Sequence, residues 1–160
     1  MTSRPRLLAR RIVLVASLLV GPGIVVTAAP AQAYTPSAAT VAAFEARVIY
    51  QINVQRTRYG RAKLAANWCP DYYAERWDAY LARTWTFYHQ SMYKILTGCH
   101  AARAAENLAR GYTTADRTVA AWMASPGHRA NVLDGLLTRV GVAAVYARGQ
   151  WVVAADFTRP

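Results

Sequence analysis

Apolar residues recur at helical spacing in the first part of the chain after its N-terminal segment. They fall three or four positions apart, which is the spacing of one helix face. The residues that share this spacing are Val41, Phe44, Val48 and Ile52. Gly60 then interrupts the pattern, as glycine commonly does at a helix end. The pattern therefore predicts an amphipathic helix over about residues 37–59.

A second helix is predicted after Cys69-Pro70, because proline suits the first helical position. The helix carries an apolar stripe at intervals of four, formed by Tyr73, Trp77 and Leu81. We interpret this stripe as a face that packs into the core. Residues 84–102 show no clear period, so we expect loops and a short helix there.

The next segment, residues 104–109, fits either a strand or an extended turn. Thr113 or Thr114 can cap a helix that follows it, and Ser125 with Pro126 can begin another. Two short helices are therefore predicted before the last part of the chain.

The end of the chain changes to a period of two, the signature of β-strands. The alternating apolar residues are Val140, Val142, Ala144 and Tyr146, then Trp151, Val153, Ala155 and Phe157. The turn residues Ala147-Arg-Gly-Gln150 separate the two runs and indicate a hairpin. Helices followed by an antiparallel pair predict an α+β fold.

The N-terminal 33 residues have the organisation of a signal peptide. Four arginines precede an apolar run from Ile12 to Ala29, and Ala31-Gln-Ala33 supplies a cleavage site. A membrane anchor is the alternative, but Gly21-Pro-Gly23 interrupts the apolar run. We predict a signal peptide over 1–33, a domain over 34–160 with no transmembrane segment after cleavage, and secretion. Arg10-Arg11 leaves both Sec and twin-arginine export open.

The charge balance favours acidic partners. The whole chain has a formal net charge of +11, which draws a protein toward anionic lipids or cell-wall polymers. The arginines are scattered, and no nucleic-acid-binding motif accompanies them, so we interpret them as a solvated basic surface and expect no nucleic-acid partner. We expect a monomer.

Cys69 and Cys99 are the two cysteines of the chain. In an exported protein an even pair indicates a disulfide. The alternative is a thiol metal ligand beside His100, but no partner lies at a zinc-site spacing. We therefore predict a Cys69–Cys99 bond, which would tie the segment that bears His89 to the start of a helix.

Two histidines and one carboxylate carry the candidate chemistry: His89 after an aromatic run, Glu106 in Ala105-Glu-Asn-Leu-Ala109, and His128. His128 falls in the first turn of a predicted helix, where the helix dipole favours neutral imidazole. Structural roles remain open for all three, such as a loop hydrogen bond for His89 or backbone contacts for Glu106.

Several motifs in fixed order resemble the CAP superfamily of cysteine-rich secretory proteins, antigen 5 and pathogenesis-related 1, also called the SCP domain. The motifs are Asn53-x-x-Arg56-x-x-x-Gly60 with Leu64, Phe87-Tyr-His89, Ala105-Glu-Asn-Leu-Ala109, Trp122-Met-x-Ser125-Pro-Gly-His-Arg-x-Asn-Val-Leu133, Val140-Gly-Val142, and Trp151 before Phe157. The likeness covers nearly all of the chain after the signal peptide and is greatest to the short bacterial exported branch.

The resemblance implies an α–β–α sandwich with a small antiparallel sheet between helical layers. It also implies a cleft with two histidines and two glutamates, in which some members bind zinc or another divalent metal. Matched by motif, the cleft residues here are His89, Glu106 and His128, with the two histidines as metal ligands. Ser125 stands where the fuller pattern has its second glutamate.

Three functions fit these features. The favoured one is a binding module for a lipid, a sterol or a cell-envelope component, rather than an enzyme. The alternative is a zinc-dependent hydrolase or protease in which His89 and His128 hold the metal and Glu106 is the general base. The third is a structural or host-interaction protein whose cleft does no chemistry.

Overall fold

The computed structural model describes residues 34–160, and the predicted signal peptide lies outside them. The helices are α1 (Ala38–Arg58), α2 (Trp68–Thr84), α3 (Met92–Gly98), α4 (Ala115–Ala124) and α5 (Pro126–Leu133). The strands are β1 (Ala65–Ala66), β2 (Arg103–Arg110), β3 (Arg139–Ala147) and β4 (Gln150–Arg159). The sheet has the order β1-β3-β4-β2, with β2 at one edge.

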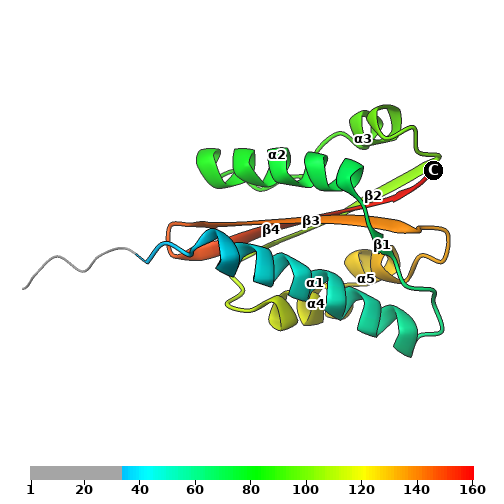
Figure 1. Cartoon of the computed structure of the whole chain (residues 1–160), viewed down its shortest axis with the longest axis horizontal. Coiled ribbons are helices and arrows are strands. Elements are labelled where there is room, and N and C mark those ends of the chain that lie inside the picture. The colour runs from blue at the N-terminus through cyan, green and yellow to red at the C-terminus, as the bar shows by residue number, and fades with distance from the viewer. Residues whose placement is uncertain (1–33) are drawn as a thin grey trace, which may run out of the picture. The chain divides into compact units, whose positions relative to one another are not determined.

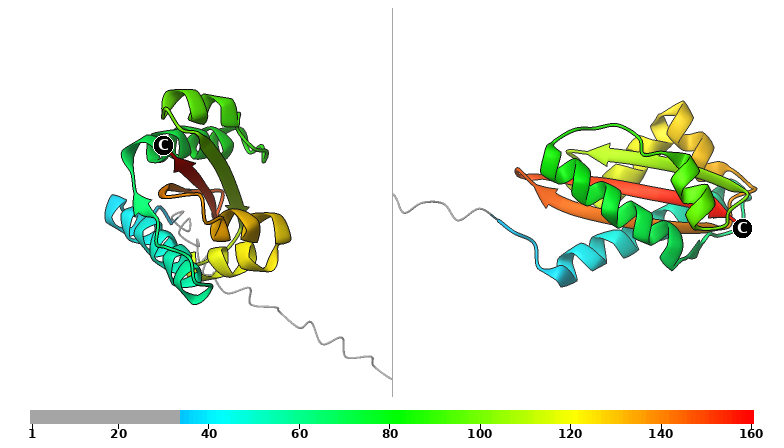
Figure 2. Two further views of the ribbon diagram at one scale, coloured as in Figure 1. Left: turned by 90° about the vertical axis from the view of Figure 1, so that its right-hand side faces the viewer. Right: turned by 90° about the horizontal axis from the view of Figure 1, so that it is seen from above.

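The helices form two layers with the sheet between them (Figure 1). Helices α1, α4 and α5 cover one face, and α2 and α3 cover the other, as the perpendicular views also show (Figure 2). The β3–β4 hairpin and β2 pair antiparallel, and only the two-residue β1 is parallel to its neighbour. The predicted α+β class and α–β–α sandwich are confirmed.

The main hydrophobic core lies under α1, α4 and α5. Its largest side chains are fully buried aromatic and aliphatic residues, among them Trp122, Phe157, Ile52, Val48 and Leu137. The indole nitrogen of Trp122 donates to the carbonyl of Leu108 at 2.9 Å, so this large ring is also fixed to β2. Trp122 and Trp151 both belong to this core.

The second core, under α2, is smaller and is built mostly from alanine, valine and leucine. The sheet-facing side of α2 contains Ala74, Asp78, Leu81 and Ala82. The predicted core stripe is confirmed for Leu81 and in part for Trp77, which is partly buried and packs against this core. It is wrong for Tyr73, which is partly buried but does not belong to this core. A small-residue face lets α2 lie close to the sheet.

Two carboxylates accept hydrogen bonds from the edge of β3 that β1 leaves unpaired, because β1 pairs with only the first two residues of β3. Asp71 accepts a hydrogen bond from the amide of Val142 at 3.1 Å, and Glu45 accepts one from the amide of Ala144 at 2.9 Å. At Gly141 a Cβ would lie 2.0 Å from the backbone nitrogen of Asp71. Glycine is required there because the start of α2 touches β3.

Arg56 is 1% exposed, so the prediction of a solvated basic surface is wrong for this residue. Its guanidinium donates to four carbonyl oxygens at 2.7–3.1 Å, those of Ala62, Val132, Asp134 and Leu137. Four acceptors satisfy a buried cation that would otherwise be costly to desolvate. Arg56 thus joins α1 to the loop that follows it and to the segment between α5 and β3.

Most predicted helix starts lie where the sequence placed them. Thr114 caps α4 through a hydrogen bond from the amide of Arg117, and Ser37 caps α1. Ser125 occupies the N-cap position of α5 but makes no side-chain capping bond, so its predicted capping role is wrong. Its amide instead continues the α4 pattern by donating to the carbonyls of Ala121 and Trp122.

The predicted disulfide between Cys69 and Cys99 is present, with the two Cα atoms 5.7 Å apart. Cys69 lies in the first turn of α2 and Cys99 caps α3 at its C-terminal end. The bond closes the α2–α3 layer around the loop that carries His89. No helix of residues 34–160 is long and apolar enough to cross a bilayer.

Candidate functional site

The site is built around a hydrogen bond between the side chains of His89 and Glu106. His89 lies in the loop between α2 and α3, and Glu106 lies on the edge strand β2. The distance from His89 Nδ1 to Glu106 Oε1 is 2.6 Å. The imidazole is 58% exposed while the carboxylate is 1% exposed. A buried acceptor therefore holds an accessible ring in a fixed orientation, with its Nε2 atom left free.

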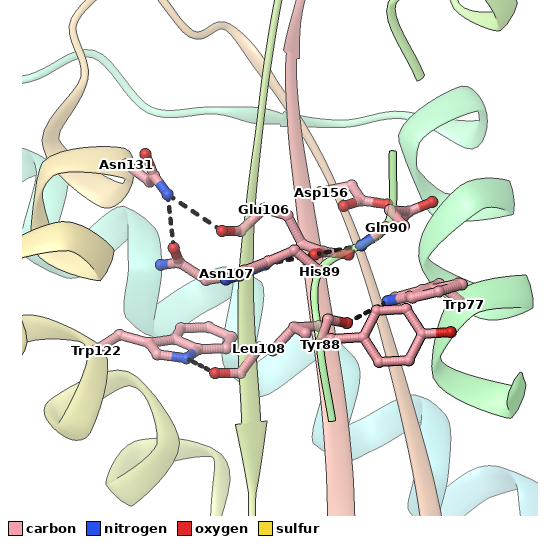
Figure 3. Close-up of polar contacts among 10 residues, drawn as sticks. All are labelled: Trp77, Tyr88, His89, Gln90, Glu106, Asn107, Leu108, Trp122, Asn131 and Asp156. Carbon is pink, nitrogen blue, oxygen red and sulfur yellow. Dashed lines mark hydrogen bonds and ion pairs between the residues drawn. The ribbon is translucent and has the colours of Figure 1, made fainter. Parts of the chain in front are cut away.

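Gln90 and Asp156 complete a polar cluster beneath this pair, and sequence reasoning missed both. Gln90 donates to Glu106 through its amide and its side chain, at 3.2 and 2.9 Å, and its side chain also donates to Asp156 at 2.8 Å. Glu106 and Asp156 are direct cross-strand partners on β2 and β4. Figure 3 shows the side chain of Gln90 directed at the two carboxyl groups.

Asp156 is fully buried. Burial raises its pKa well above the ordinary value, the negative charge of Glu106 raises it further, and the hydrogen bond from Gln90 offsets part of the shift. The raised pKa favours the neutral form of Asp156 over its carboxylate. In that form Asp156 adds no second negative charge beside Glu106.

His128 approaches from the other face of the sheet, on α5. Its carbonyl accepts a hydrogen bond from the side chain of Asn107 at 3.0 Å, and Asn131 donates to both the Asn107 side chain and the Glu106 carbonyl. Asn107 therefore fixes α5 to β2. Asn131 ties its helix to the strand (Figure 3).

The pKa of His128 is lowered, first by partial burial and second by the nearby charge of His89. The lowered pKa favours the neutral form of His128. A neutral imidazole can accept a hydrogen bond or bind a metal. His89 and Glu106 are in direct contact, and His128 is joined to the same strand through the bond between its carbonyl and Asn107.

The donor set is smaller than that of a closed metal site. Within residues 34–160 no group of three or more His, Cys, Asp or Glu side chains is arranged to hold a metal ion. Ser125 supplies no carboxylate, and Glu106 is engaged with His89 and Gln90. Of the three candidate residues, the two histidines are then the remaining donors.

These features define a class of protein: an α–β–α sandwich with a histidine and carboxylate site at its sheet edge, stabilised by a disulfide. The family model described as the cysteine-rich secretory protein family (CAP) matches residues 49–157. The chain therefore belongs to the cysteine-rich secretory protein (CAP) family.

One relative is YkwD from Bacillus subtilis, which is described as uncharacterized. It is 30% identical over 133 residues, which cover 78% of this chain and 51% of that protein. The chain thus spans about half the length of this relative. Among solved structures, an extracellular protein with an SCP domain from Bacillus anthracis superposes with a TM-score of 0.68 at 21% identity, over 76% of this chain and 42% of the other. An outer surface protein from Borrelia burgdorferi gives a TM-score of 0.65 at 18% identity, over 70% of this chain and 89% of the other. At these identities, the two solved structures show a shared fold and nothing further.

Proposed function

We propose that this chain is a secreted ligand-binding module whose cleft is formed by His89, Glu106 and His128. The observation that carries the proposal is the His89–Glu106 pair, in which a buried carboxylate presents an exposed imidazole. Binding sites are commonly built this way, with a few polar groups held in place by buried partners. The extracellular and outer-surface descriptions of two structural neighbours support an export role.

A divalent metal is part of this proposal, as an auxiliary group held by His89 and His128. Glu106 occupies His89 Nδ1 and thereby leaves Nε2 for a metal, which is the carboxylate–histidine arrangement common around zinc. The lowered pKa of His128 keeps its ring in the form that binds metal. When bound, the metal would offer an open coordination position to a ligand.

The same geometry does not favour the hydrolase alternative. A general base needs a carboxylate oxygen directed at a water molecule in the site. Both oxygens of Glu106 already accept hydrogen bonds, from His89 and from Gln90. Glu106 is better suited to orienting His89 than to removing a proton.

Zinc titration by calorimetry tests the cleft, using the secreted form of the chain. We expect one saturable site, with affinity reduced about tenfold or more in each of His89→Ala and His128→Ala. His100→Asn is the matched control because His100 is exposed and lies outside the cleft. Equal binding by all four proteins would contradict the assignment of the two histidines.

A second measurement addresses the ligand. Lipid vesicles with and without sterol, isolated cell-envelope polymers, and casein would be offered to the same four proteins. We expect retention of an envelope component or a lipid, reduced by His89→Ala, and no cleavage of casein. Casein cleavage lost in the two cleft variants would instead support the hydrolase.

A further inference from the structure

A groove of about 780 Å³ runs along the outer side of α2 toward α3, and His89 lies in its lining. The groove extends along α2 beyond His89, and its chemistry differs from that of the His89–Glu106 pair. The lining consists of aromatic rings, basic side chains and small polar groups. Of the lining residues, none is an aspartate or a glutamate.

The aromatic part of the groove is a fixed platform. Trp77 and Tyr80 are stacked at 5.0 Å between ring centroids, with 14° between their planes, and Tyr88 meets both rings edge-on. The Trp77 indole donates to the carbonyl of Tyr88 at 3.0 Å, and the hydroxyl of Tyr88 donates to that of Tyr80 at 3.0 Å. Figure 3 shows the bond from Trp77 to Tyr88. The rings therefore hold one another in place and lose little entropy when a ligand binds.

The basic part of the groove consists of Arg76, Arg83 and Lys94. Each arginine lies over a tyrosine of the same helix, Arg76 over Tyr72 at 5.3 Å and Arg83 over Tyr80 at 5.6 Å. A guanidinium held over a ring keeps its outward N–H groups available for carboxylate or phosphate. With three cations and no carboxylate in the lining, the groove is complementary to a negatively charged ligand.

We propose that this groove binds an anionic glycan, a chain of sugar rings that carries carboxylate or phosphate groups. The proposal rests on the proposed function, because it names a ligand class for the region that His89 borders. Sugar rings offer flat C–H faces to aromatic platforms and hydroxyls to polar groups such as Ser91 and Gln90. Ala79 is the one aliphatic residue of the lining, which does not suit a lipid tail.

The concave shape also favours a chain over a membrane surface. Trp77 and Tyr80 are partly buried and lie within the groove, whereas membrane-inserting rings must project outward. Single-stranded nucleic acid also stacks on aromatic rings next to cations. It therefore serves as a competitor in the test.

Calorimetry with defined probes tests the proposal on the wild-type chain with its disulfide intact. The probes are hexagalacturonate for carboxylate sugars, a purified teichoic acid for phosphate sugars, methyl-esterified hexagalacturonate, hexaglutamate and a dT hexamer. We expect binding of hexagalacturonate or teichoic acid that weakens at high salt. The ester, the peptide and the oligonucleotide should bind at least about tenfold more weakly.

The variant Arg76→Gln with Arg83→Gln removes two groove charges from exposed positions and should retain the wild-type melting temperature. We expect it to lose about tenfold or more in affinity for the glycan, since two charge-assisted contacts are absent. The matched control, Arg58→Gln with Arg117→Gln, removes the same charge from exposed positions outside the groove, and should change the affinity less than twofold.

The remaining outcomes separate this proposal from the preceding one. Equal losses in the two double variants would mean that net charge and not the groove attracts the glycan, and would overturn the proposal. Equal affinity for the neutral ester, for hexaglutamate or for the dT hexamer would also overturn it. If no glycan binds while zinc titrates His89 and His128, the groove assignment fails and the cleft assignment stands.

Discussion

Asp78 gives the sharpest test of the energetics of this fold. It lies on the sheet-facing side of α2 and is 0% exposed, and among the described residues neither carboxyl oxygen has a partner at hydrogen-bonding geometry. Burial raises its pKa from 3.8 to about 8. The main chain of Val145 offsets part of the shift, and the charges of Glu45 and Glu106 add to it. Asp78 is therefore protonated in the folded protein at neutral pH and ionised in the unfolded chain.

The direction of the pH effect follows from this difference. Between the unfolded and folded pKa values the folded state holds one more proton, so stability falls as the pH rises. The slope is about 1.4 kcal/mol per pH unit, which gives a loss of about 2.7 kcal/mol from pH 5 to pH 7. The contribution is fully present below pH 3.8 and is lost by the time the pH passes about 8.

The test uses the variant Asp78→Asn, because asparagine keeps the shape of the side chain and cannot ionise. Urea unfolding of both proteins at pH 5, 6, 7 and 8 gives the free energy of unfolding at each pH. We expect the free energy of unfolding of the variant, relative to that of the wild type, to rise by about 2.7 kcal/mol between pH 5 and pH 7. Asp156 shifts the stability of both proteins alike, so its effect cancels in the comparison.

A matched control is Asp116→Asn. Asp116 is exposed, and its hydrogen bond with Arg47 holds its pKa below the ordinary value. Both of its pKa values lie below pH 5, so the difference between this variant and the wild type should stay constant from pH 5 to pH 8. If the free energies of unfolding of Asp78→Asn and the wild type changed in parallel with pH, the raised pKa assigned to Asp78 would be wrong.

Three further predictions concern parts of the fold that the sequence motifs mark. Arg56→Met leaves four carbonyls without their donor and should cost about 3–5 kcal/mol in urea unfolding; Arg58→Met, at an exposed position, should change stability by less than about 0.5 kcal/mol. Cys69→Ser with Cys99→Ser should cost about 3–4 kcal/mol, and reduction of the wild type should lower the melting temperature equally. Gly141→Ala places a Cβ 2.0 Å from the backbone of α2, so it should cost at least about 3 kcal/mol, and a wild-type melting temperature would contradict this close contact.

The elements that could be predicted from the sequence are those whose periodicity is local. The α1 pattern ends at Gly60, which adopts a φ of +67°, and the alternating tail forms the β3–β4 hairpin. The face of α2 could not be predicted the same way. Tyr73 and Trp77 share the helical spacing of Leu81, but Trp77 is only partly buried against the core and Tyr73 lies outside it. The helix approaches the sheet closely at Gly141, which favours small side chains on the facing side.

The site was predictable only in part. His89, Glu106 and His128 follow from motifs, but Gln90 lies in the stretch without a clear period, where no pattern indicates orientation. Asp156 did carry a signal that sequence reasoning missed. It interrupts the apolar run of Gln150–Arg159, and a continuous apolar run marks a strand buried on both faces, so a carboxyl group within it must be buried.

The two helical layers divide stability and chemistry between them. The layer of α1, α4 and α5 contains the large apolar side chains, whereas the sheet face beneath α2 combines small apolar residues with the buried carboxyls Asp78, Glu106 and Asp156. Such carboxyls contribute little to stability, and the small side chains bury little apolar area. This layer also carries both His89 and the aromatic groove. The Cys69–Cys99 bond joins α2 to α3 in this same layer, so the covalent link reinforces the part of the fold that is least able to hold itself together by packing.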